Sequence, residues 1–141
     1  MFLVYDDGVV VVDAPPPFAQ HIRSAIAEVT NKPITHVIYS HSHIDHIGGT
    51  SSLGGQPVIL AQEETKRLLA RAKDPSRPLP TVTFADRYTL KVGSQVLELS
   101  VTAAPGAAGV RVWQVETEAS PLPHPLHALL TRAQDRDQES G

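Results

Sequence analysis

Residues 39–49 read YSHSHIDHIGG, which places three imidazoles and one carboxylate within six consecutive positions. In an extended segment side chains alternate between faces, so His41 and His43 can point toward one cation. Once the backbone turns into a helix, Asp45 and His46 can be aimed at a second cation. Imidazole nitrogens and carboxylate oxygens at this spacing suit zinc, and the two glycines that follow allow a tight turn close to the ligands.

The alternative to a metal site is a solvated, histidine-rich turn, which needs neither imidazoles nor a carboxylate at this spacing. The chain has no cysteine, so disulfides and thiolate zinc sites are excluded. Any zinc must therefore use histidine and carboxylate ligands, and the cluster in residues 39–49 is where the sequence provides them.

Residues 40–49 closely resemble the metal-binding motif of the metallo-β-lactamase-fold hydrolases. The resemblance implies that His41 and His43 bind a first zinc and that Asp45 and His46 bind a second. It also implies a catalytic role for Asp45, which would orient the water or hydroxide held between the metals. The order of elements from residue 1 to about 101 resembles the first half of the αββα sandwich of that family.

Asp13 closes an early apolar strand and has two possible roles. In the resembled family an acid at this place braces the metal loop through backbone hydrogen bonds. Alternatively, Asp13 only leads into the turn at residues 15–17, which are three prolines. Both interpretations remain open at this point.

Length and composition indicate one domain with an ordinary aliphatic core, because 41% of the 141 residues are hydrophobic and 5% are aromatic. The formal net charge of −3 argues against a nucleic-acid partner. The longest apolar run, Val9–Val12, is too short to span a bilayer, so no membrane segment is expected. Residues 1–6 lack the features of a secretory signal, which makes the cytoplasm the default location. A longer N-terminus carrying a signal stays open, and the oligomeric state is not indicated.

The residues before the motif predict a strand hairpin, a covering helix and a buried strand. Phe2–Tyr5 and Val9–Val12 flank residues 6–8, where Asp-Gly favours a tight turn with positive φ angles. An amphipathic helix is predicted over residues 18–29, because apolar residues recur there at helical spacing, at Phe18, Ile22, Ala25, Ile26 and Val29. Ile34–Tyr39 fits a buried strand that delivers the metal loop at its carboxyl end.

The residues after the motif predict a short helical turn at 47–53, ended by the glycines at 54 and 55, and then alternating strands and one surface helix. Residues 74–80 are proline-rich and predict a loop flanking the site. The expected elements are strands at Val58–Leu60, Val82–Phe84, Tyr88–Val92 and Gln95–Val101, and a helix at Gln62–Ala72.

The chain changes character after Ser100, so we divide it into residues 1–100, the N-terminal half of a metallo-β-lactamase-like domain, and an atypical, partly irregular stretch at 101–141. The second segment has no Ile, Phe, Tyr, Lys or Asn and contains several prolines. A strand at 110–115 and a short helix at 126–133 are expected there, with a frayed end. A frameshifted gene end and a divergent sequence with the same fold both account for this composition.

The resemblance also implies a third histidine for the first zinc after the strand that ends at Val101, yet residues 102–109 contain no ligand. His124 and His127 are interpreted as solvated residues rather than replacement ligands. His21 is expected on the surface, and His36 is expected as a hydrogen-bonded core histidine.

The fold class expected is therefore α/β (α+β), a partial αββα sandwich whose second half is missing or atypical. The expected function is a zinc-dependent hydrolase with one or two zinc ions, acting on a small-molecule ester, amide, lactam or related bond. The alternative is a truncated or degenerate relative that binds metal without catalysis. An interaction domain with an incidental histidine cluster is disfavoured by the motif, and the sequence does not name the substrate.

Overall fold

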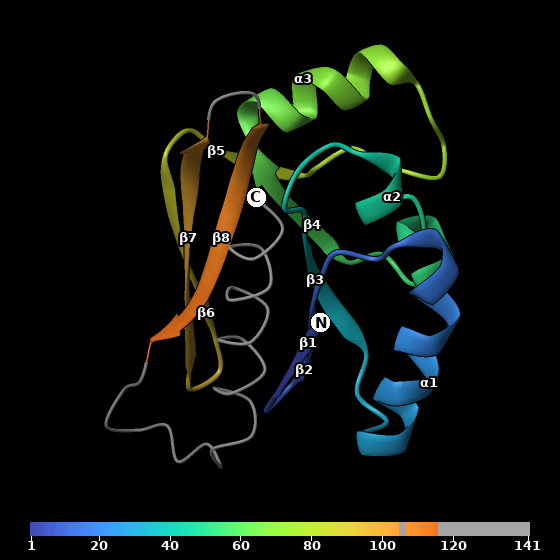
Figure 1. The fold of residues 1–141 in the computed structure, drawn as a ribbon. Coiled ribbons are helices and arrows are strands. Elements are labelled where there is room, and N and C mark those ends of the chain that lie inside the picture. Colours follow the sequence, from blue (N-terminus) through green and yellow to red (C-terminus); the bar gives the residue numbers. More distant parts are fainter. Residues whose placement is uncertain (105–106, 116–141) are drawn as a thin grey trace.

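The computed structural model describes residues 1–104 and 107–115. This part of the chain forms a helical layer, a five-stranded sheet and a three-stranded sheet, packed in that order (Figure 1). The α-helices are α1 (Ala19–Val29), α2 (Ile44–Ile47) and α3 (Glu63–Ala72), and two short 3-10 helices are η1 (Pro16–Phe18) and η2 (Thr50–Leu53).

The five-stranded sheet positions the histidine motif. Its strands are, in spatial order, β1 (Phe2–Tyr5), β2 (Gly8–Val12), β3 (Ile34–Ile38), β4 (Val58–Gln62) and β5 (Val82–Phe84). β1 and β2 form the predicted antiparallel hairpin, and β2 to β5 are parallel. Parallel strands share one carboxyl edge, so β3 delivers the motif at the edge where open α/β sheets place their sites.

The three-stranded sheet is an antiparallel meander of β6 (Arg87–Val92), β7 (Gln95–Ala104) and β8 (Ala107–Val115). Gly93 has a φ of 57° in the tight turn that joins β6 and β7, which contain the strands predicted at Tyr88–Val92 and Gln95–Val101. β8 also contacts the other sheet's loop, because the Val110 amide donates to the Ser40 carbonyl at 2.8 Å.

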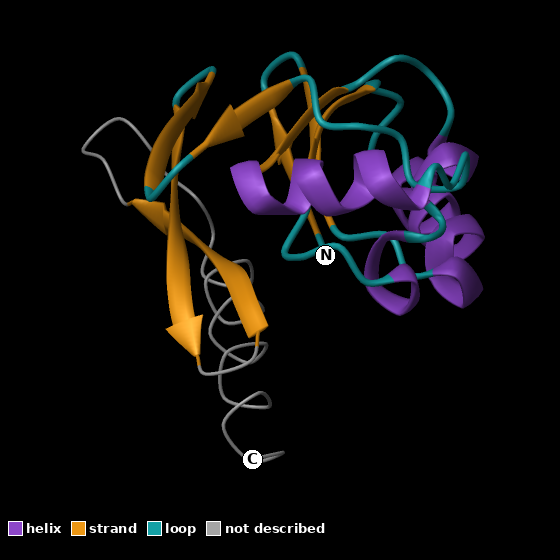
Figure 2. Cartoon of the chain, turned by 90° about the horizontal axis from the view of Figure 1, so that it is seen from above, coloured by secondary structure: helices purple, strands orange, loops and turns teal. Residues whose placement is uncertain are grey.

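Alternation along the central strands produces two cores, one on each face of the five-stranded sheet. Figure 2 shows the three-stranded sheet on the side of the five-stranded sheet away from α1. Toward the helices, Val11 and Val37 pack with Ile26 of α1. Toward the second sheet, Val10 and Ile38 belong to a cluster whose second-sheet members are Leu90, Val92, Leu97, Leu99 and Val110. Burying one such side chain stabilises the fold by roughly 1.5–3 kcal/mol, so the two sheets and the helices are held as one body.

The expected α/β class and the partial sandwich are confirmed. Three of the four layers of an αββα sandwich are present, and residues 1–104 and 107–115 provide no second helical layer. The helix predicted at 126–133, the frayed end, His124 and His127 all lie outside the described residues. β7 continues through Ser100, where the composition changes, and β8 contains the strand expected at 110–115.

Two details of the predicted elements are wrong. Phe18 and Val29 were expected to be part of the apolar stripe of α1, but these residues are 58% and 65% exposed. Ile26 of the expected stripe is buried, and so is Ala19, which was not part of it. The turn between β1 and β2 contains no positive φ angle. Gly8 lies in β2, where a Cβ atom would overlap the Thr35 side chain, so close strand packing explains this glycine.

Among the residues that the structure describes, no helix has the length and apolar character needed to cross a membrane.

Candidate metal centre

The histidine motif forms a loop between β3 and α2 that is anchored at both ends. Tyr39 is fully buried, its amide donates to the Leu60 carbonyl at 2.9 Å, and its hydroxyl donates to the Pro78 carbonyl at 2.9 Å. Burial raises the pKa of Tyr39 to about 12, so this hydroxyl remains a donor at neutral pH. At the other end, the carbonyl of His43 accepts from the amides of His46 and Ile47 at 3.1 Å and begins α2.

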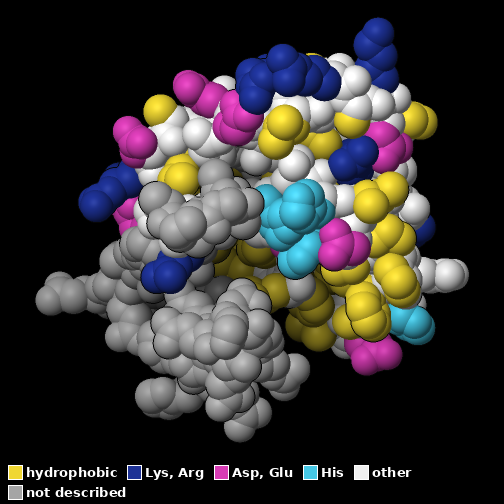
Figure 3. Space-filling model, turned by 45° about the horizontal axis from the view of Figure 1, so that its top comes forward, with side chains coloured by type: hydrophobic (Ala, Val, Ile, Leu, Met, Phe, Trp, Pro, Cys, Tyr) yellow, Lys and Arg dark blue, Asp and Glu magenta, His cyan; other side chains and the backbone are white. Residues whose placement is uncertain are grey.

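The three imidazoles of the motif lie side by side. The ring centroid of His41 is 4.7 Å from that of His43 and 4.0 Å from that of His46. Figure 3 shows histidine side chains gathered at the surface next to an acidic side chain. The Asp45 side chain is 75% exposed, and its Oδ2 atom lies 3.9 Å from His46 Nε2. The loop therefore collects the predicted donors on one exposed patch.

Asp13 braces this loop, which decides between its two interpretations. Its Oδ1 atom accepts from the Ser40 amide at 2.8 Å, and its Oδ2 atom accepts from the Ser40 hydroxyl at 2.5 Å. The same Oδ2 atom lies 3.4 Å from His46 Nδ1. Asp13 has a φ of 54°, a left-handed conformation that Asp and Asn tolerate better than most residues. The carboxylate thus links the end of β2 to both ends of the histidine motif.

The hydrogen bonds of Ser40 fix the tautomer of His41. The serine hydroxyl has a single proton, and it donates that proton to Asp13. It therefore accepts from His41 Nδ1–H at 2.8 Å, which leaves the Nε2 lone pair of His41 available to a metal. Burial, and secondarily the neighbouring His46, lowers the pKa of His41, so the ring is neutral at neutral pH.

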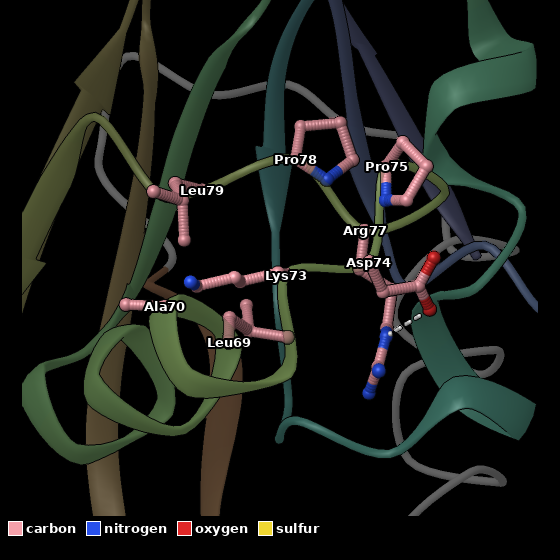
Figure 4. Close-up of a pocket in the computed structure, with 8 residues that line it drawn as sticks. All are labelled: Leu69, Ala70, Lys73, Asp74, Pro75, Arg77, Pro78 and Leu79. Atoms are coloured by element: carbon pink, nitrogen blue, oxygen red, sulfur yellow. Dashed lines mark hydrogen bonds and ion pairs between the residues drawn. The ribbon is translucent and has the colours of Figure 1, made fainter.

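The proline-rich loop at residues 74–80 flanks the motif, as predicted. Arg77 Nη1 donates to the Ser42 carbonyl at 2.7 Å, and Arg77 Nε donates to Asp74 Oδ2 at 2.8 Å. The Arg77 side chain is 15% exposed, so this ion pair is largely screened from water. Arg77 and Asp74 also line an open cavity of about 300 Å³ beside the end of α3 (Figure 4).

The chemistry of the donor set fits a divalent metal, since it combines imidazole, carboxylate and hydrogen-bonded supporting groups. The positions of these side chains support a metal site less well than their chemistry does. Within residues 1–104 and 107–115, no group of three or more His, Asp or Glu side chains is arranged to hold one metal ion. The assignment of His41 and His43 to a first ion and of Asp45 and His46 to a second, with two donors for each ion, therefore stays a prediction.

The two other described histidines lie apart from the motif. His21 is exposed on α1, as expected. His36 is hydrogen-bonded as expected, with Nδ1 2.9 Å from the Thr35 hydroxyl, but it is half-buried rather than part of the core. Burial lowers its pKa.

Two supporting residues were missed from the sequence. Ser40 was assigned no role from the sequence, and its role follows from the strand pairing of β2 with β3, which brings it to Asp13. Arg77 follows a Pro-Ser pair in a loop, and no local pattern distinguishes a largely buried arginine from a solvated one.

Comparisons with known proteins identify the family and the fold of this chain. The family described as the metallo-beta-lactamase superfamily matches residues 1–119. A metallo-β-lactamase from Pontibacter korlensis is 26% identical with a TM-score of 0.65, covering 80% of this chain and 53% of that chain. A flavo di-iron protein from Thermotoga maritima shares the fold at 19% identity with a TM-score of 0.63, covering 80% of this chain and 29% of that chain.

Among curated proteins, the alpha subunit of 2,4-dinitroanisole O-demethylase from Nocardioides sp. (strain JS1661) is 30% identical over 99 residues. That match covers 67% of this chain and 30% of the relative. The chain thus spans about half or less of the length of these relatives. The family match over residues 1–119, together with the two-sheet fold, identifies the chain as a member of the metallo-β-lactamase superfamily.

Proposed function

We propose that this chain contains the metal-binding half of a metal-dependent hydrolase that acts on a small-molecule substrate. His41 and His43 would hold a first zinc ion, and Asp45 and His46 a second. The observation that supports this assignment is the network in which Asp13 and Ser40 hold the Nδ1 side of His41 and leave its Nε2 atom free. Metal-binding histidines commonly have such a hydrogen-bonded partner on the other ring nitrogen.

A bound zinc ion would supply a water of lowered pKa and a positive charge for the developing oxyanion. The protein's own groups would do the positioning. Asp45 is exposed at the patch, so it can orient the attacking water or accept a proton from it. Asp13 and Arg77 fix the loop backbone at Ser40 and Ser42, so the ligands start from a defined position.

Zinc is favoured by the histidine and carboxylate ligands, although imidazole also suits iron. The di-iron neighbours show only a shared fold at their level of identity, so the test must measure both metals. Elemental analysis of purified wild type, His43→Ala and Asp45→Ala should show strongly reduced metal in both variants. His21→Ala is the control, because His21 is exposed and lies outside the motif. Equal metal content in all four proteins would contradict the assignment of His43 and Asp45 as metal ligands.

The alternative, a relative that binds metal without catalysis, is supported by the absence of a three-donor group in the described residues. Turnover separates the two proposals. The assay panel contains a chromogenic lactam, a lactone, a phosphodiester and, because of the curated relative's name, 2,4-dinitroanisole. Metal-dependent turnover of one reporter that is lost in Asp45→Ala supports the hydrolase. Metal retention without turnover supports the alternative.

A further inference from the structure

The cavity between the carboxyl end of α3 and the proline-rich loop is called here the α3 cavity (Figure 4). Its volume is about 300 Å³, which is at the lower limit of the range typical of small-molecule sites. Among the described residues that line it, none is a predicted metal ligand. The α3 cavity is therefore separate from the candidate metal centre.

Most of the wall of the α3 cavity is apolar. Leu69 is 2% exposed and lies in the packed side of α3, whereas Leu79 of the proline-rich loop is 48% exposed. An apolar group that enters the cavity would contact both leucines and shield Leu79 from water, which is favourable by roughly 0.8 kcal/mol for each buried CH₂ group. The remaining apolar lining residues are Ala70, Pro75 and Pro78.

The charged lining residues leave one positive charge unbalanced. Arg77 Nε donates to Asp74 Oδ2 at 2.8 Å, so the charges of these two side chains offset each other. The backbone amide of Lys73 donates to the Leu69 carbonyl at 3.1 Å, but within the described residues the Lys73 ammonium has no hydrogen-bond or ion-pair partner. The lining therefore carries one net positive charge, on Lys73.

The position of Lys73 makes this charge available to a ligand. In Figure 4 its side chain points toward the part of the cavity that Ala70 and Leu79 form, and away from the pair of Asp74 and Arg77. A helix dipole favours a basic residue at its carboxyl end, but Arg71 already occupies the last turn of α3. The dipole of α3 therefore does not require the Lys73 charge.

The loop side of the cavity is held in place by hydrogen bonds. Asp74 Oδ1 accepts from the Ser76 amide at 2.9 Å and from the Ser76 hydroxyl at 2.7 Å. The Pro78 carbonyl accepts from the buried Tyr39 hydroxyl at 2.9 Å. A wall that is ordered before binding lowers the entropy that a ligand must offset.

We infer that the α3 cavity binds a small monocarboxylate with an apolar body. The single unbalanced ammonium matches one carboxylate, and the apolar wall matches a hydrocarbon group. At roughly 30 Å³ for each non-hydrogen atom, the volume admits a ligand of about ten such atoms. This site does not depend on the proposed metal-dependent function. Its occupant would rest against Arg77, which also donates to the Ser42 carbonyl of the histidine motif.

The test adds phenylacetate, phenylacetamide or acetate to the purified chain and follows the methyl resonances of Leu69, Ala70 and Leu79. Phenylacetate should shift these resonances and bind about two- to fivefold more tightly than phenylacetamide, which keeps the ring but has no charge. Acetate, which keeps the charge but has no ring, should bind at least tenfold more weakly than phenylacetate. Because binding is read at the cavity, a carboxylate that binds a metal at the histidine motif is not counted.

Two variants separate the charge from the apolar wall. Lys73→Met should abolish the preference for phenylacetate over phenylacetamide, and Lys66→Met is its control, because Lys66 is exposed on α3 and does not line the cavity. Leu79→Ser should weaken both aromatic probes by at least threefold. Its control is Leu68→Ser, since Leu68 is 39% exposed on α3 and is also outside the lining.

Three results would overturn the inference. The first is a folded wild type in which millimolar phenylacetate shifts none of the three methyl resonances. The second is equal affinity of wild type for phenylacetate and phenylacetamide, which would contradict a carboxylate ligand. The third is a preference for phenylacetate that persists in Lys73→Met, which would contradict the role of the Lys73 ammonium.

Discussion

Removing the charge of Asp13 should weaken metal binding without unfolding the chain. In Asp13→Asn the side chain keeps its size, and Asn tolerates the left-handed φ of 54° that this position requires. The amide retains one acceptor oxygen but presents an NH₂ group where the Ser40 hydroxyl or His46 Nδ1 now meets a carboxylate oxygen. The variant therefore removes the support of the ligands and leaves the backbone in place.

The magnitude follows from the hydrogen bonds that change. A hydrogen bond to a charged group contributes about 1.5–3 kcal/mol, and the Asn oxygen can still accept from the Ser40 amide. The lost support at the Ser40 hydroxyl thus corresponds to about a 10–100-fold loss of zinc affinity, at 1.4 kcal/mol for each tenfold change. The range agrees with the usual effect of replacing a group that orients a metal ligand.

Competition with a chromophoric chelator measures the apparent zinc Kd of wild type and Asp13→Asn, and thermal unfolding of the metal-free proteins measures their Tm. Asp7→Asn is the matched control, because Asp7 is an exposed acid in the β1–β2 turn and should bind zinc like wild type. An Asp13→Asn protein that binds zinc within twofold of wild type would refute the bracing role. A large fall in Tm with unchanged affinity would assign Asp13 to folding alone.

Two further predictions concern residues outside the motif. Arg77→Met should weaken zinc binding by roughly tenfold, because the Ser42 carbonyl loses its 2.7 Å donor and Asp74 loses its ion-pair partner. Chelator competition measures the zinc Kd of this variant, and a Kd equal to that of wild type would contradict the prediction. The lowered pKa of His36 means that the unfolded chain binds its proton at higher pH than the folded chain does. The free energy of unfolding of the metal-free protein should therefore fall as pH decreases from about 6.5 toward that lowered pKa. Urea titrations at several pH values measure this dependence, which His36→Gln should make less steep. An equal pH dependence in wild type and His36→Gln would rule His36 out as the cause.

Much of the fold was predictable because its elements follow strong local patterns. The runs Phe2–Tyr5 and Ile34–Ile38 are β-rich, and α1 follows the helical spacing of Ile22 and Ile26. The predicted burial of residues at the ends of these patterns was less reliable. Phe18 and Val29 fit the helical spacing, but they lie at or just before the ends of α1, beyond the reach of the sheet that buries Ile26.

The donors of the site were predictable from residues 39–49, whereas their supports were not. Asp13 and Ser40 are 27 positions apart and meet only because β2 and β3 pair in parallel. Arg77 reaches Ser42 across 35 positions from a loop without regular structure. Such contacts depend on the register of strands and the path of a loop, which no local periodicity specifies.

The loop is held from three directions, and this has a consequence for how metal would bind. Asp13 fixes the Ser40 amide from β2, Arg77 fixes the Ser42 carbonyl from the proline-rich loop, and the Val110 amide of β8 fixes the Ser40 carbonyl. Fixing a residue's backbone costs roughly 1–2 kcal/mol, and here that cost is met on folding, before any metal arrives. Only side-chain torsions of the ligands then remain to be ordered by a metal. Metal affinity should consequently depend on the number of ligands that the chain provides and on the contacts that keep their loop in place, which Asp13→Asn and Arg77→Met remove.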